Sequence, residues 1–516
     1  MSMSGHVPTV PAPDPLREPD LLAADPEGIV EVGRLVGELT SEAAKALRRR
    51  GGPLPPLTPL ELAHVVDAQL PDGPLPADGG GRDAVLALAR TYASHTVDLA
   101  HPRAAAHLQP PALGVATATD VLASAFNASV DTWDSGPVAV ELESRLVRAL
   151  TALAGYGPHA DGVLTPGGTA SNLQALLIAR DTALRAQRDV RSAGLTGMAT
   201  QPVVYCSELA HFSVARACSV LGLGEEAVRP VPADAHRRMT AEALERALAA
   251  RPENELPIAV VATAGTTDYG SVDPLAELAA AAHRHGARLH VDAAYGGGAL
   301  FSDRLRPLLD GVEHADSLTI DLHKTAWQPA AASVLLVRDR ADLTGSTGLR
   351  VAYLNPDDDG AAGYDGLLGH SLATTRRADA LKVVATFLAL GRRGIGRMLE
   401  TCHDLAVFAA ERITAHPRLE LVATPVLTTV VFRYVPAGGT ADPARADAVN
   451  GALRRRLLLQ GRALIGRTDD LAGDATTGRV RLKLTLLNPQ ATRDDIQELL
   501  TAVEAAGRAV ETEELP

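Results

Sequence analysis

From about Gly162 onward, short apolar runs rich in β-branched residues alternate with alanine- and leucine-rich stretches, and this alternation constrains the fold most strongly. It is typical of β-α crossover units built around a mainly parallel sheet. The sequence therefore predicts an α/β domain with such a sheet. The candidate strands are Pro202–Cys206, Ile258–Thr263, Arg288–Asp292, Ser317–Ile320 and Ser333–Val337.

The chain on either side of this region has a different residue pattern, and 516 residues are more than a single hydrophobic core usually accommodates. Residues 1–110 hold a Pro- and Asp-rich lead-in, a plausible amphipathic helix over Ile29–Arg50 and many turn signals, so they predict an N-terminal helical segment. Residues 111–392 are the predicted large α/β domain. Residues 393–516, in which a helix begins at about Arg393 and two strand-like runs flank helical segments, predict a small α+β domain.

The charge and the cysteine content exclude several classes of protein. A formal net charge of −13 argues against nucleic-acid partners, because phosphate backbones require clustered Lys and Arg side chains. The three cysteines, Cys206, Cys218 and Cys402, form neither a CxxC pair nor a zinc-type spacing, so we expect no metal site and a reducing, cytoplasmic location. Since no apolar run is long enough to span a membrane, we expect no membrane partner.

Two segments could bind a phosphate and a neighbouring polar group. In DGVLTPGGTASNLQ, Gly167 and Gly168 permit a close backbone approach, and Thr169 offers a hydroxyl beside the free N–H groups of a starting helix. A tight connection without a ligand would explain the same turn. In VVATAGTTDYG, Thr266 and Thr267 follow an apolar strand, where hydroxyls face the usual ligand crevice of such sheets, although an ordinary Ser/Thr turn would look the same.

Three titratable residues also follow predicted strands. His211 lies between a strand and a small-residue helix in SELAHFSVARA, and Asp292 closes the apolar strand of LHVDAAYGGG. A carboxylate in such a place is costly unless it meets a cation or caps a helix. Lys324 follows the next strand in DSLTIDLHK, and a lysine held in an apolar pocket is the usual partner of an aldehyde. Only four lysines occur in the chain, so lysine chemistry has few other candidates.

The order of these features is more informative than any one of them. A phosphate cradle, a histidine, hydroxyls, a carboxylate and a lysine follow one another, each near the C-terminal end of a predicted strand. Pyridoxal 5'-phosphate (PLP) needs N–H donors for its phosphate, a flat group over its ring, an anion for its ring nitrogen and a lysine for its aldehyde. A nucleotide-binding or regulatory protein would explain the cradle alone, and no GxxxxGK[ST] motif is present. We therefore predict a PLP enzyme.

The HVDAAY element around Asp292 and the pair His323-Lys324, in this order, resemble those of the group II PLP-dependent decarboxylases. The resemblance runs from about His101 to Asp495, and the family includes aromatic-amino-acid, glutamate and diaminobutyrate decarboxylases. It implies PLP fold type I, the fold of aspartate aminotransferase, with a large α/β domain of mainly parallel sheet, a small C-terminal α+β domain and an N-terminal helical segment. It also implies a homodimer with the active site at the subunit interface.

The resemblance assigns roles to individual residues. Lys324 would bind the cofactor aldehyde as a Schiff base, Asp292 would pair with the pyridine nitrogen, and His211 would stack on the ring. Tyr353, in the loop after the lysine, would protonate the substrate carbon once carbon dioxide has left, although an ordinary surface tyrosine is the alternative for that position. The implied cofactor contacts are Gly168, Thr169, His211, Thr267, Asp292, Ala294, His323 and Lys324.

The substrate is the least determined feature of the sequence. Finer similarity is to the diaminobutyrate and lysine decarboxylase-like branch, in stretches such as NASVDTWDSGP and VAYLNPDDD. In the family the segment matching His107–Pro111 lines the substrate pocket, and His107 and Gln109 would favour a polar or cationic substrate end. We therefore expect decarboxylation of a diamino acid (2,4-diaminobutyrate, lysine or ornithine) for a secondary-metabolite pathway. Departures after DTWD and at Trp327 leave glutamate, branched-chain or aromatic amino acids, and an oxidative deaminating variant, as alternatives.

Overall fold

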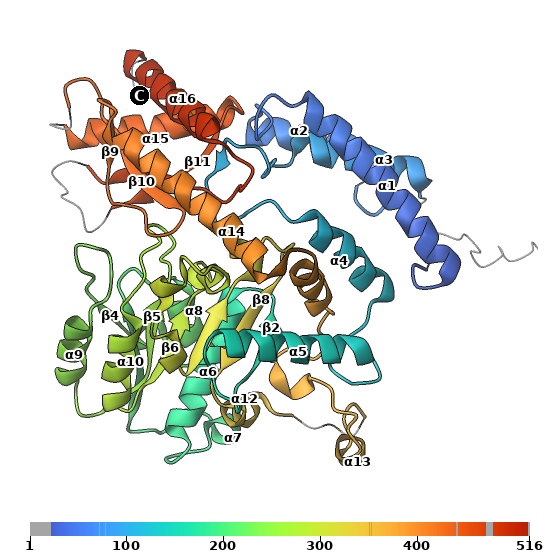
Figure 1. The fold of residues 1–516 in the computed structure, drawn as a ribbon, viewed down its shortest axis with the longest axis vertical. Coiled ribbons are helices and arrows are strands. Elements are labelled where there is room, and N and C mark those ends of the chain that lie inside the picture. Colours follow the sequence, from blue (N-terminus) through green and yellow to red (C-terminus); the bar gives the residue numbers. More distant parts are fainter. Residues whose placement is uncertain are drawn as a thin grey trace, which may run out of the picture.

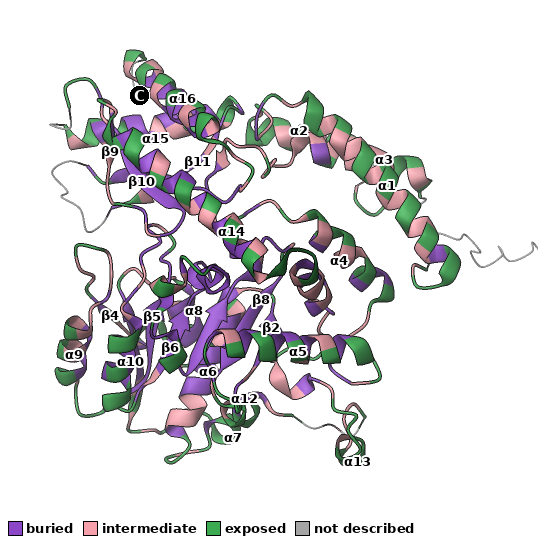
Figure 2. Cartoon of the chain, in the orientation of Figure 1, coloured by how far each residue is buried: buried purple, intermediate pink, exposed green. Residues whose placement is uncertain are grey.

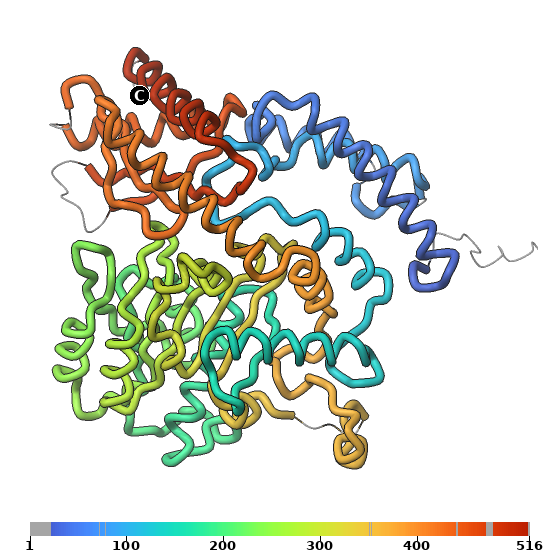
Figure 3. The backbone as a smooth tube through the Cα atoms, viewed as in Figure 1, coloured from blue at the N-terminus to red at the C-terminus, as the bar shows by residue number. Residues whose placement is uncertain are grey.

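The computed structural model describes residues 22–71, 73–77, 79–349, 351, 353–439, 442–470 and 478–513. Three parts follow one another along the chain, as the colours of Figures 1 and 3 show. Helices of the N-terminal part project from the molecule, a large sheet with helices around it forms the middle, and a smaller sheet with three long helices forms the C-terminal part.

The large sheet has seven strands in the order β2-β8-β7-β6-β5-β3-β4. All neighbours run parallel except those of β8, which is antiparallel to both β2 and β7. The C-terminal ends of the other strands therefore meet at one edge of the sheet. The strands are β2 (Asp161–Thr165), β3 (Gln201–Ser207), β4 (Val228–Val231), β5 (Glu255–Thr263), β6 (Arg288–Asp292), β7 (Ser317–Ile320) and β8 (Ser333–Val337).

Helices cover both faces of this sheet, which explains why its strands are almost continuously apolar. Buried residues of α5 (Pro137–Leu153), α9 (Ala241–Ala249) and α10 (Leu275–Arg284) share one core cluster with the sheet. Residues of α6 (Gly168–Leu184) and α8 (Ser213–Val220) share another with β3 and β5. Figure 2 shows the strands as the buried centre of this part, with exposed residues on the outer sides of the helices.

The remaining elements of the middle part precede, connect or follow these units. They are α4 (Gly114–Phe126), α7 (Val190–Ala193), α11 (Leu322–Thr325), α12 (Arg340–Thr347), α13 (Asp357–Ala361) and the 3-10 helices η1 (Glu225–Ala227), η2 (Gly296–Phe301), η3 (Arg306–Leu309), η4 (Val312–His314) and η5 (Leu368–His370).

The small sheet has the order β1-β11-β12-β10-β9 and packs against α14 (Ala380–Thr414), α15 (Pro443–Leu459) and α16 (Arg493–Thr512). Strand β1 lies in the predicted N-terminal segment, yet it pairs in parallel with β11. The helix predicted from about Arg393 begins earlier, at Ala380, and is interrupted by Gly391, whose φ of 67° is left-handed. The domain boundaries at residues 110 and 392 stay predictions. The strands are β1 (Ala104–Ala105), β9 (Leu419–Leu421), β10 (Thr429–Tyr434), β11 (Leu464–Asp469) and β12 (Val480–Thr485).

The N-terminal part consists of α1 (Pro26–Arg49), α2 (Pro59–Gln69) and α3 (Gly81–His95). Helix α1 starts before the predicted Ile29, because Asp25 accepts a hydrogen bond from the Gly28 N–H and a proline occupies the first turn. Across the described ranges of the chain, no helix combines the length and the hydropathy that crossing a bilayer requires.

Candidate active site

A cavity of about 630 Å³ lies where the strands of the large sheet reach their C-terminal ends. The turn after β2, the start of α8 after β3, and the segments after β5, β6 and β7 all contribute to its wall. Eight of the residues predicted from the sequence line it together: Gly168, Thr169, His211, Thr267, Asp292, Ala294, His323 and Lys324.

The turn between β2 and α6 leaves no room for a side chain at Gly168. A Cβ added there would lie 3.1 Å from Ala294 Cβ and 3.2 Å from both carboxylate oxygens of Asp321. These contacts are tighter than ordinary van der Waals separation, so glycine allows the first turn of α6 to reach the cavity wall. Because the first N–H groups of a helix have no partner within it, this turn can bind an anion.

Lys324 is held by an acidic neighbour one helical turn earlier. Its Nζ lies 2.9 Å from Asp321 Oδ2, and the side chains are 22% and 3% exposed respectively. His323 Nε2 lies 3.5 Å from the same oxygen, while His323 Nδ1 donates to the Ala332 carbonyl at 2.8 Å. Asp321 Oδ1 is buried and has no hydrogen-bond partner in the described part of the chain. The lysine is therefore positioned at the cavity by a buried carboxylate.

Asp292 is buried, and both of its oxygens accept hydrogen bonds. Oδ1 accepts from the Ala294 N–H at 3.1 Å, and Oδ2 accepts from Asn172 Nδ2 at 2.7 Å. These two donors orient the carboxylate at the cavity without neutralising its charge. It can therefore hold a cation such as a protonated ring nitrogen.

His211 contributes a half-buried ring to the same cavity. Burial lowers the pKa of its imidazole, and the Asp292 carboxylate opposes that effect. The neutral form is therefore favoured at pH 7, and Ser213 Oγ lies 2.8 Å from Nδ1. A flat, uncharged ring suits a stacking contact with an aromatic cofactor.

Three predicted site residues lie elsewhere in this single chain. Tyr353 is 81% exposed, follows α12 and is not among the described residues that line the cavity. His107 and Gln109 are also exposed, and of their segment Leu108 is the residue that contacts the cavity. Partial loss of hydration, followed by the charge of Lys483, lowers the pKa of the His107 imidazole even though the residue as a whole is exposed.

Sequence reasoning missed several residues that the structure places at the cavity. Asn172 contacts Asp292 from the second turn of α6, and its spacing of four from Gly168 would have placed both on one helical face. Asp321, three residues before Lys324, was not among the predicted site residues, and Phe212 and Tyr295 carried no signal beyond their neighbours. Their positions depend on how the strand ends converge.

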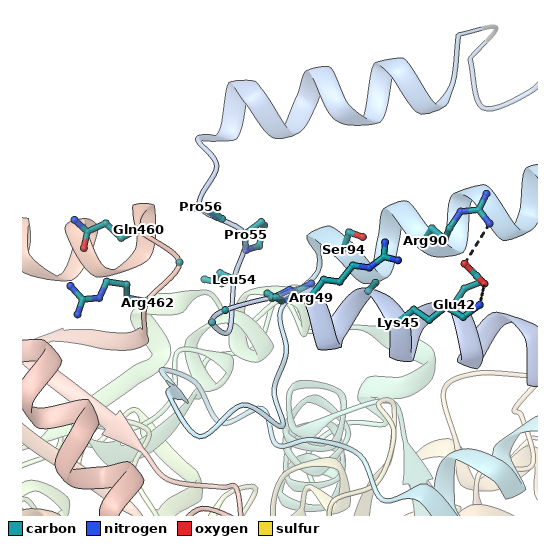
Figure 4. Close-up of a pocket in the computed structure, with 15 residues that line it drawn as sticks. Glu42, Lys45, Arg49, Leu54, Pro55, Pro56, Arg90, Ser94, Gln460 and Arg462 are labelled. Atoms are coloured by element: carbon teal, nitrogen blue, oxygen red, sulfur yellow. Dashed lines mark hydrogen bonds and ion pairs between the residues drawn. The ribbon is translucent and has the colours of Figure 1, made fainter.

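A separate pocket of about 540 Å³ lies between the N-terminal helices and the turn that precedes β11 (Figure 4). Its wall carries five basic side chains and one acidic one, Glu42, which pairs with Lys45 and Arg90. It contains none of the predicted site residues. The basic residues are Lys45, Arg49, Arg50, Arg90 and Arg462.

The cavity at the strand ends fits PLP by the chemistry of its walls. The glycine-lined start of α6 suits a phosphate, Asp292 suits a ring cation, and Lys324 suits an aldehyde. His211, the proposed stacking residue, is favoured in its neutral form, so it would not repel a positively charged cofactor ring.

Comparisons with known proteins identify the family. Residues 66–435 match the pyridoxal-dependent decarboxylase conserved domain. The chain is 43% identical over 441 residues to an L-2,4-diaminobutyrate decarboxylase of Rhizobium meliloti (85% of each chain) and 32% identical to the mouse cysteine sulfinic acid decarboxylase (87% of this chain, 90% of the relative).

A solved structure supports the same assignment at the level of the fold. The glutamate decarboxylase domain of a diaminobutyrate-pyruvate transaminase and L-2,4-diaminobutyrate decarboxylase from Vibrio parahaemolyticus superposes with a TM-score of 0.82 at 30% identity, covering 95% of this chain and 98% of that one. The cavity and the two sheets therefore belong to a group II pyridoxal-dependent decarboxylase, a PLP enzyme of fold type I that removes the carboxyl group of an amino acid.

Proposed function

We propose that this enzyme decarboxylates an L-diamino acid, and that L-2,4-diaminobutyrate is preferred over lysine and ornithine. The relative with 43% identity is named for that substrate. The observation that carries the proposal is a second, acidic cavity that shares lining residues with the first. A diamino acid differs from other amino acids by a distal ammonium, which such a cavity would attract.

The acidic cavity measures about 320 Å³ and shares His211, Phe212 and Thr267 with the main one. Its wall includes three carboxylates, Glu208, Asp268 and Asp469. The basic side chain in its wall, Arg237, is already committed to Asp470 at 3.1 Å and lies over the Tyr269 ring.

Of these three carboxylates, Glu208 is the least neutralised. Asp268 pairs with Lys483 at 2.7 Å and Asp469 with Arg467 at 3.4 Å, whereas Glu208 accepts a hydrogen bond from the Ala233 N–H. The cavity therefore presents one carboxylate, Glu208, that has no ion pair among the described residues, while Arg237 shares Asp470 with Arg481. It favours a substrate with a distal cation and disfavours acidic substrates such as the one for which the mouse relative is named.

The proposed roles of the main-cavity residues follow from their positions. Lys324 would hold PLP covalently, His323 and the Gly168–Thr169 turn would contact its phosphate, His211 and Ala294 would lie on either side of its ring, and Thr267 would add a hydroxyl. Bound PLP supplies an electron sink for the bond to the carboxyl group, and Asp292 would keep its ring nitrogen protonated. His107 and Gln109 remain proposed substrate residues.

Replacing Glu208 by Gln should raise the KM for 2,4-diaminobutyrate by a factor of about 1.4 to 5, because exposed ion pairs contribute about 0.2–1 kcal/mol. The KM for 2-aminobutyrate, which lacks the distal ammonium, should stay unchanged. Steady-state assays of carbon dioxide release with both substrates measure the difference. Glu253→Gln, at an exposed turn before β5, is the matched control.

Two results would count against the diamino-acid proposal. A parent enzyme that prefers glutamate, a branched-chain or an aromatic amino acid would refute it directly. An aldehyde in place of the amine as the product would instead indicate the oxidative alternative, which Tyr353 disfavours because it can return a proton to the substrate carbon.

A homodimer is also proposed, and the N-terminal helices support it. Within the described parts of α1, α2 and α3, the buried residues are Gly28 and Ala93, and Figure 2 shows these helices as largely exposed. Their apolar side chains face solvent in a single chain, which is unfavourable unless another surface covers them. The large exposed examples are Val30, Leu47, Leu60, Val66, Val85, Leu88 and Tyr92.

The purified protein should have about twice the chain mass of 53.8 kDa in light scattering. Leu60→Asp with Leu88→Asp should yield inactive monomers, because two buried carboxylates would be unpaired at the interface. Val220→Asp, an equally exposed change on α8, should leave the mass unchanged. A fully active parent monomer would refute the dimer.

Mixing two variants that each lack amine-forming activity shows which subunit's cavity Tyr353 serves in such a dimer. Since the tyrosine lies outside the cavity of its own chain, we propose that it serves the cavity of the partner subunit. Dissociated Lys324→Ala and Tyr353→Phe subunits, mixed and reassociated, should then regain about a quarter of the parent amine-forming activity, since half of the dimers would carry one complete site. No recovery would show that the tyrosine acts within its own chain.

We also propose that the enzyme is cytoplasmic and serves a pathway of secondary metabolism. The three cysteines, Cys206, Cys218 and Cys402, are buried and unpaired, which suits a reducing compartment. The diamine product would be a building block for a secondary metabolite.

A further inference from the structure

A chain of buried hydrogen bonds runs behind the cavity wall and connects His211 to Asp292. Its members are the buried side chains of Ser317, His290, Asn172 and Ser213. They come from strands β6 and β7 and helices α6 and α8. Because each hydrogen bond has a direction, the positions of the protons can be worked out along the chain.

The Asp292 carboxylate sets the orientation of the Asn172 amide. Asp292 Oδ2 lies 2.7 Å from the amide and can only accept, so the NH2 group must face it. The opposite rotamer would place the amide oxygen against the carboxylate. The Asn172 oxygen then faces Thr319 Oγ1 at 3.1 Å and His290 Nε2 at 3.0 Å, and it accepts from both.

His290 is consistent with this direction. Its Nε2 donates to Asn172, and burial lowers the pKa of this imidazole to about 4, so the ring is neutral at pH 7. The neutral ring carries one proton, and Nδ1 is therefore an acceptor for the Ser317 hydroxyl at 2.9 Å.

The second proton of the Asn172 amide points to Ser213. Asn172 Nδ2 lies 2.9 Å from Ser213 Oγ, which has a proton of its own to donate, and His211 Nδ1 lies 2.8 Å from that oxygen. The Ser213 N–H also points to Nδ1 at 3.3 Å. The Ser213 N–H can only donate, and the Ser213 hydroxyl, which accepts from Asn172, is free to donate its own proton, so Nδ1 is the acceptor and the single proton of the neutral ring lies on Nε2.

We propose that Asn172 and Ser213 are positioning residues that fix His211 as the Nε2–H tautomer while holding Asp292 as an acceptor. In this form His211 acts toward the cavity as a hydrogen-bond donor and cannot serve there as a base. Asn172 binds Asp292 and Ser213 at the same time, so the orientation of the carboxylate and the proton position of the histidine are set together. The inference rests on the proposed roles of His211 and Asp292, and its main test requires no substrate.

The test is nitrogen NMR of the PLP-loaded enzyme labelled with 15N-histidine, with the His211 signals assigned by their loss in His211→Gln. The parent should show one bare nitrogen at Nδ1 and one protonated nitrogen at Nε2. Ser213→Ala removes the hydroxyl and leaves the longer backbone N–H contact as the one donor to Nδ1, so both signals should move part of the way toward the average of two tautomers. Ser213→Thr, which keeps the hydroxyl, should restore the parent pattern, and Ser219→Ala on the exposed side of the same helix is the matched control.

Kinetics provide a second measurement. We expect Ser213→Ala and Asn172→Leu each to lower kcat by about 10- to 100-fold, as for other residues that orient a catalytic group. Because both act through one chain of hydrogen bonds, the double variant should lie within about threefold of the more damaged single variant. A proton on Nδ1 in the parent, an unchanged tautomer in Ser213→Ala, or fully multiplicative kinetic losses would overturn the inference. A lack of activity toward diamino acids would refute the proposed substrate and leave the tautomer result intact.

Discussion

Replacing Lys324 by Ala should abolish the visible absorption band that covalently bound PLP gives, together with all decarboxylase activity. Of the four lysines, Lys324 is the one that lines the cavity at the strand ends. Borohydride treatment, which locks a cofactor onto the lysine that holds it, should then leave no labelled peptide. Absorption spectra and peptide mass spectrometry before and after reduction measure both effects.

The same variant should be less stable but still folded. Removal of the ammonium leaves the Asp321 carboxylate buried without its lysine partner and with His323 Nε2 at 3.5 Å as a neighbour, at a cost of about 1–3 kcal/mol. Lys45→Ala, which removes an exposed lysine of α1, should change neither the spectrum nor the stability. A borohydride-stable cofactor adduct in Lys324→Ala would disprove the assignment.

Asp292→Asn should keep much of the PLP binding but lose about three orders of magnitude in kcat. A carboxylate in contact with a ring cation contributes on the order of 5 kcal/mol at an effective dielectric near 20, and an amide cannot replace that interaction. Titration of the apoprotein with PLP, followed by steady-state kinetics, separates binding from turnover.

This substitution should also destabilise the apoprotein by about 1–3 kcal/mol, because an amide has only one oxygen for the two N–H groups that Asp292 accepts. One of the donors, Asn172 Nδ2 or the Ala294 N–H, would face the new NH2 group. Thermal unfolding of the apoprotein tests this effect without cofactor. Unchanged turnover in Asp292→Asn would show that the carboxylate is merely structural.

The strands of the site could be predicted because their apolar runs are short and end in chemically unusual residues. The predicted ranges Arg288–Asp292, Ser317–Ile320 and Ser333–Val337 coincide with β6, β7 and β8. Parallel strands have their C-terminal ends at one edge of the sheet. The residues that directly follow these strands can therefore be predicted to lie close together from the strand assignments alone. The direction of β8 could not be predicted in this way, since a fully buried antiparallel strand is as apolar as a parallel one.

The contacts of the polar residues behind the site could not be predicted, because the two partners of each contact are remote in the sequence. Asn172 contacts Asp292, His290 and Thr319 across separations of 120, 118 and 147 residues. In the sequence, Asn172 is an ordinary residue of a helix and His290 a polar interruption of an apolar strand. Their function depends on the three-dimensional packing of α6 on the sheet, which no local pattern contains.

Strand β1 has a consequence for the synthesis of this protein. Ala104 and Ala105 pair with Leu464 and Ile465. Strand β1 is therefore synthesised early but cannot pair until residues near the other end of the chain have been made. While the ribosome adds the intervening residues, the large sheet can fold, since a domain generally folds as a unit once it has emerged. The N-terminal helices remain without their final anchor until β11 arrives. We therefore expect chains that are truncated before β11 to have a folded centre with unattached N-terminal helices, and to be exposed to proteolysis there.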